Sequence, residues 1–323
     1  MTLLLLLAAL TYAPTDPVLV VVNKPASTVS IVSLASGAVV ATLPTGANPH
    51  ETAASHDGRW AVVSDYGAQA PGNTLTVVDL VARKVARTID LGFPRPHGIG
   101  FLPDGQTVAV TSETAGMVVL VNVVSGTVVS SHPTSQAVSH MLALTPEGGT
   151  AYTANIRSGS ISAVDLTDRV ATRTLPVGTM TEAIGLSPDG REAWVGSNNT
   201  GKVYAVDVGA WKVIDSMQTS GFPYRIAFAP DGRTALITNP MSDEIHLYDV
   251  ASRRRKGTIA GHGSNGSQGQ PLAAVFTRDG RTAYVSLASA GEVAEIDLAA
   301  LTVRRYLPAG DGPDGLALVE PGA

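Results

Sequence analysis

The stretch that decides the fold runs from Pro223 to Asn239 and reads Pro-Tyr-Arg-Ile-Ala-Phe-Ala-Pro-Asp-Gly-Arg-Thr-Ala-Leu-Ile-Thr-Asn. Two short apolar runs flank a Pro-Asp-Gly turn. Pro230 fixes its own φ near −65°, and Gly232 readily adopts a positive φ, so the segment reverses direction tightly. The pattern predicts a β-hairpin.

This unit recurs along the whole chain. The acidic residue of its turn appears at Asp57, Asp104, Glu147, Asp189, Asp231 and Asp279, so successive copies lie 47, 43, 42, 42 and 48 residues apart. A period of about 40 to 45 residues is typical of a four-stranded propeller blade. The third strand of most copies ends in an aspartate that we expect to cap the following turn; these residues are Asp79, Asp165, Asp207, Asp249 and Asp297.

The two ends of the repeat region are incomplete in complementary ways. The first copy begins at Val18 with a second strand, whereas residues 314–318 form a first strand with nothing after it. Six complete copies and this split copy make seven blades. We therefore predict an all-β, seven-bladed propeller of four-stranded antiparallel blades, closed by pairing of the N- and C-terminal segments.

Several motifs resemble those of a known family. The segments Tyr152-Thr153-Ala154-Asn155 and Leu236-Ile237-Thr238-Asn239, the Pro-Asp-Gly turns and the Val-x-x-Val-Asp third strands are similar to the YVTN-type β-propeller repeat family over roughly residues 18–320. That family includes surface-layer and periplasmic proteins, and its fold resembles those of lactonases and lyases that act on cyclic esters. The resemblance implies the fold, but fold likeness alone does not transfer chemistry.

The N-terminal segment differs from the repeats. An unbroken apolar run from Leu3 to Leu10 is followed by small residues, which is typical of a signal peptide. We interpret residues 1–13 as this peptide, 14–17 as a linker, 18–320 as the propeller and 321–323 as a tail. We expect an exported, monomeric protein in the periplasm or at the cell surface. No later segment is long and apolar enough for a transmembrane span.

Composition excludes several classes of site. A formal net charge of −5 argues against a nucleic-acid partner, because phosphate binding needs clustered Lys and Arg. With no cysteine, disulfides, thiolate metal sites and covalently attached haem are excluded. A divalent transition metal would have to be held by histidine, carboxylate or backbone oxygen.

One repeat position carries the candidate site. The residue that enters the innermost strand of each blade is, around the ring, His50, His97, His140, Glu182, Tyr224, Leu272 and Asp314. Inner strands converge on the propeller axis, so these side chains approach one another at the channel mouth. Imidazoles with a carboxylate suit a metal ion, and we predict His50, His97, His140 and Glu182 as ligands. The alternative is that Pro-His-Gly is simply how this repeat enters its inner strand.

Five further residues complete the predicted site. Tyr224, Arg225 and Asp314 are candidates for binding a ligand, and His262 lies in a Gly-rich loop on the same face. Glu51, beside His50, is a possible general base at the rim, a role that Glu182 could also fill.

Three functions remain open at this point. The first is a propeller that binds a small ligand, metal ion or protein partner at the channel mouth, including a scaffold with no metal. The second is a metal-dependent hydrolase or lyase that uses Glu182 or Glu51 to move a proton. The third is binding of a non-covalent cofactor, such as haem d1 or a quinone, through a ring histidine.

Overall fold

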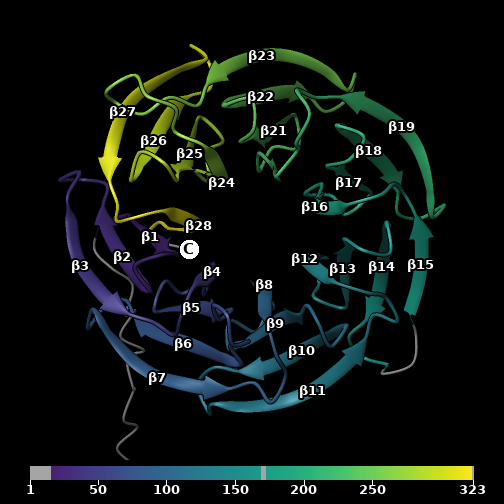
Figure 1. Cartoon of the computed structure of the whole chain (residues 1–323), viewed down its shortest axis with the longest axis horizontal. Helices are drawn as coiled ribbons and strands as arrows, with labels where there is room; N and C mark the ends of the chain where they lie inside the picture. The colour runs from purple at the N-terminus through teal and green to yellow at the C-terminus, as the bar shows by residue number, and fades with distance from the viewer. Residues whose placement is uncertain (1–15, 169–171, 322–323) are drawn as a thin grey trace, which may run out of the picture.

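The computed structural model describes residues 16–168 and 172–321, which form seven four-stranded antiparallel sheets and no helix. The sheets are arranged radially around a central channel as the blades of a propeller (Figure 1). Blade 1 comprises β28 and β1–β3, and blades 2 to 7 follow in chain order as β4–β7, β8–β11, β12–β15, β16–β19, β20–β23 and β24–β27. The predicted signal peptide lies outside the described residues. Within them, no helix has the length and apolarity needed to cross a membrane.

Each blade places its four strands in order from the channel outwards. The innermost strands are β28 (Pro313–Val319), β4 (Pro49–Ala54), β8 (Pro96–Phe101), β12 (Ser139–Leu144), β16 (Thr181–Leu186), β20 (Arg225–Phe228) and β24 (Pro271–Phe276). The second strands are β1 (Val18–Asn23), β5 (Trp60–Asp65), β9 (Thr107–Ser112), β13 (Thr150–Asn155), β17 (Glu192–Ser197), β21 (Thr234–Asn239) and β25 (Thr282–Leu287). The third strands are β2 (Thr28–Ser33), β6 (Thr74–Asp79), β10 (Met117–Asn122), β14 (Ser160–Asp165), β18 (Lys202–Asp207), β22 (Glu244–Asp249) and β26 (Glu292–Asp297). The outermost strands are β3 (Val39–Pro44), β7 (Lys84–Asp90), β11 (Thr127–Pro133), β15 (Thr172–Pro176), β19 (Lys212–Gln218), β23 (Arg254–Ala260) and β27 (Thr302–Pro308).

The turns form as their sequence predicts. Gly232, in the Pro-Asp-Gly turn between β20 and β21, has a φ of 67°, and the Asp231 carboxylate accepts a 2.9 Å hydrogen bond from the backbone N–H of Arg233. After the third strand of blade 2, Asp79 accepts the backbone N–H groups of Val81 and Ala82 at 3.1 and 2.8 Å. The predicted turn caps are therefore confirmed, because the recurring acidic residues accept backbone hydrogen bonds within the turns.

The ring closes through its two ends. Strand β1 pairs with β28 in antiparallel register, with Val18 opposite Val319, Leu19 opposite Leu318 and Val20 opposite Ala317. The N-terminal segment thus supplies three strands of blade 1, and the C-terminal segment supplies the fourth. This confirms the predicted closure, which gives blade 1 the same four strands as the other blades.

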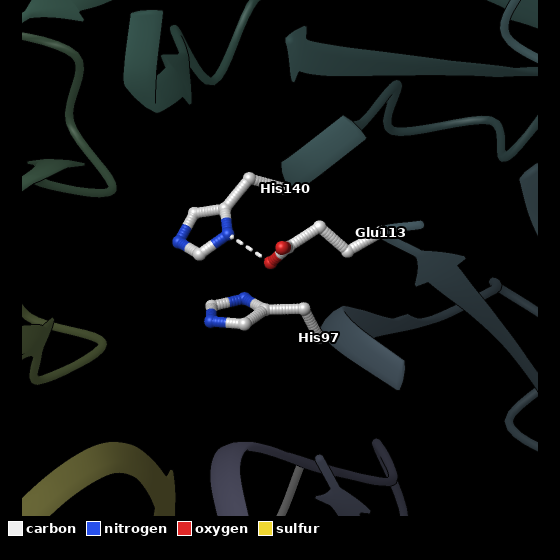
Figure 2. Close-up of side chains that lie close together, drawn as sticks. All are labelled: His97, Glu113 and His140. Carbon is white, nitrogen blue, oxygen red and sulfur yellow. Dashed lines mark hydrogen bonds and ion pairs between the residues drawn. The ribbon is translucent and has the colours of Figure 1, made fainter. Parts of the chain in front are cut away.

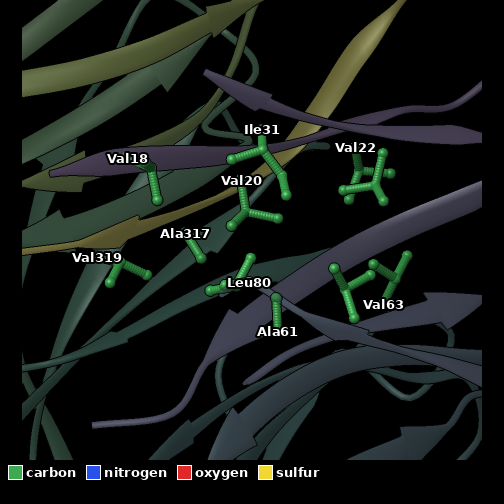
Figure 3. Close-up of a cluster of buried hydrophobic side chains, with 11 residues drawn as sticks. Val18, Val20, Val22, Ile31, Ala61, Val63, Leu80, Ala317 and Val319 are labelled. Carbon is green, nitrogen blue, oxygen red and sulfur yellow. The ribbon is translucent and has the colours of Figure 1, made fainter. Parts of the chain in front are cut away.

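The core lies between the blades. In Figure 3, Val18, Val20 and Val22 of β1 face Ala61 and Val63 of β5 in the next blade. Strand β1 is buried along its whole length because blades pack against both of its faces. The outermost strands are more exposed, and in β19 every residue except Met217 is exposed to solvent. Stability therefore comes mainly from apolar contacts between neighbouring blades.

A shift of register in the inner strands aims side chains into the channel. In β4, Pro49 pairs with Asp65 and Thr52 pairs with Val63, so one extra residue is inserted between them. This β-bulge falls at His50 and Glu51, and bulges commonly redirect side chains beside functional sites. The backbone N–H of Glu51 donates to Ser64 Oγ at 3.0 Å. A hydroxyl on the second strand thus satisfies an amide that the bulge removes from the ladder.

Asp65, the last residue of β5, is a buried carboxylate at a position where three other blades have Asn23, Asn155 and Asn239. Its Oδ2 accepts the hydroxyls of Thr74 and Thr76 at 2.8 and 2.9 Å. Burial outweighs these bonds and raises the pKa of Asp65 from 3.8 to about 6. Because the folded state holds the proton more tightly than the unfolded chain, this group lowers stability as pH rises from about 4 to about 6.

We therefore expect Asp65→Asn to be more stable than the parent chain at pH 8, by at most about 3 kcal/mol, with the gain shrinking towards pH 4. The amide can donate to the two threonine hydroxyls, as Asn155 Nδ2 donates to Ser160 and Ser162. Urea unfolding at both pH values measures the difference. Lower stability of the variant at pH 8 would contradict the expectation.

Candidate metal centre

The structure brings His50, His97 and His140 together in the channel, from the inner strands β4, β8 and β12 of three consecutive blades. His50 Nδ1 lies 2.9 Å from His97 Nε2. The rings of His97 and His140 stack with centroids 3.6 Å apart and planes 31° from parallel. All three side chains are buried, and His97 is completely so. The three imidazoles thus form one continuous row.

Hydrogen-bond partners fix the protons of the first two rings. Asn48 Nδ2, which can only donate, lies 3.2 Å from His50 Nε2, so this nitrogen accepts and the His50 proton is on Nδ1. His50 Nδ1 then donates to His97 Nε2, which places the His97 proton on Nδ1. Burial, reinforced by Lys24, lowers the pKa of His50 to about 2, and burial beside His140 lowers that of His97 well below 6.5. Both rings are neutral.

His97 Nδ1 is the exceptional atom of this row. It is buried and has no hydrogen-bond partner among the described residues. Buried polar atoms in folded proteins are nearly always paired, and an unpaired one costs about 1 to 3 kcal/mol. An atom of this kind in a channel indicates a partner that comes from outside the chain.

Glu113 lies on the open side of His97. It follows directly after β9, and its Oε2 lies 2.8 Å from His140 Nδ1, while Tyr66 Oη donates to its Oε1 at 3.1 Å. Burial alone would lower the pKa of His140, but the hydrogen bonds to Glu113 and Glu182 more than offset it and raise the pKa to about 9. His140 is therefore an imidazolium held between two carboxylates.

Figure 2 shows His97, Glu113 and His140 converging on one point in the channel. Each offers a ligand atom, and these atoms lie within 4.8 Å of one another. An ion bound at about 2.0 to 2.2 Å from each ligand separates neighbouring ligand atoms by roughly 3 to 3.5 Å, so small side-chain adjustments would complete a site. Two imidazoles and a carboxylate are a donor set that divalent transition metals accept.

Glu182, the predicted fourth ligand, lies beside this group on β16. Its Oε1 is 3.5 Å from His140 Nε2, and its Oε2 accepts a hydrogen bond from Asn198 Nδ2. It thus contacts the far nitrogen of His140. His50 also lies outside the group formed by His97, Glu113 and His140. It contacts that group through its hydrogen bond with His97. Among the predicted ligands, the structure places His97 and His140 in the group itself.

Asp314 flanks the row on the other side. Its carboxylate is completely buried and has no hydrogen-bond partner among the described residues. Its Oδ2 lies 3.6 Å from the ammonium nitrogen of Lys24 and 4.0 Å from Nδ1 of the neutral His50 ring. Burial raises its pKa. Tyr224 is close enough that Asp314 contributes to raising the pKa of the phenol, although burial is the larger cause.

Glu51 and Arg225 form an ion pair across the channel. Glu51 is on β4 in blade 2 and Arg225 is on β20 in blade 6, which lie on opposite sides of the ring. Both side chains are buried. Arg225 also donates to the carbonyl of Tyr224 at 3.0 Å and stacks over its ring. This arrangement places Glu51 inside the channel, bonded to a guanidinium, and not at the rim where we expected it.

His262 is separate from this row. It is half exposed in the loop between β23 and β24, where its Nε2 lies 3.5 Å from Asp243 Oδ2.

The sequence reasoning missed Glu113, although the repeat carries a signal for it. The first residue after the second strand of each blade forms another ring around the mouth: Lys24, Tyr66, Glu113, Ile156, Asn198, Pro240 and Ala288. Four of these contact residues of the first ring: Lys24 contacts Asp314, Tyr66 contacts His50, Glu113 contacts His140 and Asn198 contacts Glu182. Alignment of this second position would have found them.

No protein-family model matches this chain, and no curated protein matches it either. Similar solved structures do exist. A Kuenenia stuttgartiensis hydrazine synthase chain superposes with a TM-score of 0.74 at 18% identity, over 87% of this chain and 92% of that one. A functionally unknown protein from Desulfotomaculum acetoxidans DSM 771 superposes with a TM-score of 0.79 at 14% identity, over 94% of this chain and 99% of that one. At these identities the likeness establishes the propeller fold alone.

Proposed function

We propose that this protein is a propeller that binds a divalent transition-metal ion in its channel through His97 Nδ1, His140 and Glu113. The observation that carries the proposal is the buried, unpartnered His97 Nδ1 beside an imidazole and a carboxylate. An ion would displace the proton now shared by His140 Nδ1 and Glu113 Oε2.

The proton of His97 would move from Nδ1 to Nε2 and be donated to His50 Nδ1, so that the His50 proton moves to Nε2 and the Asn48 amide turns its oxygen towards it. Tyr66, which donates to Glu113, and His50, which would then accept a hydrogen bond from His97 Nε2, would orient the ligands.

Three protein ligands leave a coordination position for an exogenous molecule, as in metal sites that bind substrates. A small ligand at the channel mouth is therefore part of the proposal, as in our interpretation of the sequence. We also propose export, on the strength of the apolar run Leu3–Leu10, with the periplasm or the cell surface as the location. The motifs quoted above support membership of the YVTN-type repeat family.

The test is a metal titration of chelator-stripped protein. We expect one equivalent of Zn²⁺ to bind, and Co²⁺ to give a visible ligand-field spectrum that reports nitrogen and oxygen ligands. His97→Ala, which removes a ligand nitrogen, and Glu113→Gln, which replaces a carboxylate ligand with a neutral amide, should each lower affinity by roughly 100-fold. His56→Ala is the matched control, since this histidine is exposed in a turn outside the channel.

Thermal melts of the stripped variants separate ligand loss from unfolding. If the stripped parent chain takes up no ion, or if His97→Ala binds as tightly as His56→Ala, the metal site is wrong. The protein-interaction scaffold without metal would then be the better interpretation.

A further inference from the structure

A hollow of about 440 Å³ adjoins the proposed metal centre. It is lined by Glu113, Val138, Ile156, Arg157, Thr179 and Met180. These residues come from the mouth-face loops of blades 3, 4 and 5, next to the inner strands β12 and β16 (Figure 1). Glu113 is shared between the hollow and the metal centre, so a molecule seated in the hollow lies beside the ion.

The walls of this hollow depart from the repeat. In six blades, the residue two positions before the channel-facing residue has a positive φ. In four of these blades that residue is Asn48, Arg95, Gln270 or Gly312. In the two blades that form the hollow it is Val138, with a φ of 60°, and Met180, with a φ of 55°. Positive φ is unfavourable for a β-branched residue such as valine. Strained apolar residues at a mouth, where the other four left-handed residues are polar or Gly, indicate a binding surface.

Apolar side chains continue around the hollow. Ile156 occupies the position where the neighbouring blades have Glu113 and Asn198, and Met180 is 47% exposed. Exposed apolar residues that surround a concavity beside polar groups are typical of small-molecule sites.

Arg157 supplies the one cationic group of the lining. It is exposed, and it makes no ion pair or hydrogen bond with any described residue. Most arginines on this face are engaged: Arg95, for example, donates to the carbonyls of Gly67 and Ala68. A guanidinium without a partner at the edge of an apolar hollow is suited to a carboxylate.

We propose that this hollow binds an organic carboxylate with an apolar body. The carboxylate of this ligand pairs with the Arg157 guanidinium, and its hydrocarbon part packs on Val138, Ile156 and Met180. The opposite end of the ligand lies beside Glu113 and the ion. This inference rests on the proposed function in one respect, which is that a metal ion is bound beside Glu113.

The test compares acetate, butanoate and hexanoate by calorimetry or ligand-detected NMR, on stripped protein and on Zn²⁺-loaded protein. Affinity should rise roughly tenfold for each two methylenes added. Arg157→Gln should weaken hexanoate about fivefold and leave hexanol unchanged. Val138→Asn, which suits the left-handed backbone, should remove much of the chain-length dependence while the protein stays folded.

Equal affinity for acetate and hexanoate, or an Arg157→Gln variant that binds hexanoate as the parent does, would overturn the proposal. Because the series is also measured on stripped protein, it tests carboxylate binding in the hollow even if no metal ion binds. A metal titration that fails while the chain-length series succeeds would reject the metal site alone.

Discussion

Deletion of residues 312–323 is expected to abolish the native fold. The deletion removes β28, and with it the only partner on the channel side of β1. It also removes Leu316, Ala317 and Val319 from two inter-blade cores. The loss is comparable with the whole stability of about 5 to 15 kcal/mol that a domain possesses. The exposed edge of β1, which is apolar along Val18–Val22, should promote aggregation.

Circular dichroism melts and size-exclusion chromatography of the truncated protein measure this effect. Deletion of residues 321–323 alone is the matched control, because it spares β28, and it should behave as the intact chain does. A synthetic peptide of residues 312–321 added during refolding should restore part of the native fold by strand addition. The ring closure would be disproved by a 312–323 deletion that melts at the parent temperature.

The second large effect concerns the ion pair across the channel. Glu51→Ala or Arg225→Ala alone should destabilise the protein by about 3 to 5 kcal/mol, because each leaves a buried charge without its counterion. The double variant Glu51→Leu with Arg225→Met should be much less destabilised, since it removes both charges and restores apolar volume.

Chemical denaturation of the parent chain, Glu51→Leu, Arg225→Met and the variant with both substitutions gives a double-mutant cycle. A large coupling energy is expected because both partners are buried and each is the other's counterion. Single-variant effects that simply add in the double variant would show that the two groups do not interact in solution.

The fold could be predicted from the sequence because its determinants are local. A Pro-Asp-Gly turn and the strands on either side of it lie within 17 residues, and the pattern from Pro223 to Asn239 recurs at a blade-like period. The closure followed from the unmatched half-repeats at the two ends. Neither inference needed any knowledge of long-range contacts.

The candidate site could be predicted only in part. His97 and His140 occupy equivalent repeat positions, so symmetry alone brings them to the axis. The direction of the side chains at the bulge could not be predicted, because a shift of one residue moves a side chain to the other face of a strand. The pairing of Glu51 with Arg225 joins residues 174 positions apart and leaves no local signal.

The inner-strand bulge also separates what holds the ring together from what lines it. A residue inserted between Pro49 and Thr52 is not needed by the ladder, and the ladder's lost amide is served by Ser64. The side chains at this bulge are therefore held by contacts inside the channel and not by the ladder, as Glu51 is held by Arg225. Different contacts thus hold the blades together and fix the residues that line the channel. Chains that share 18% or less of their residues with this one keep the same ring of blades.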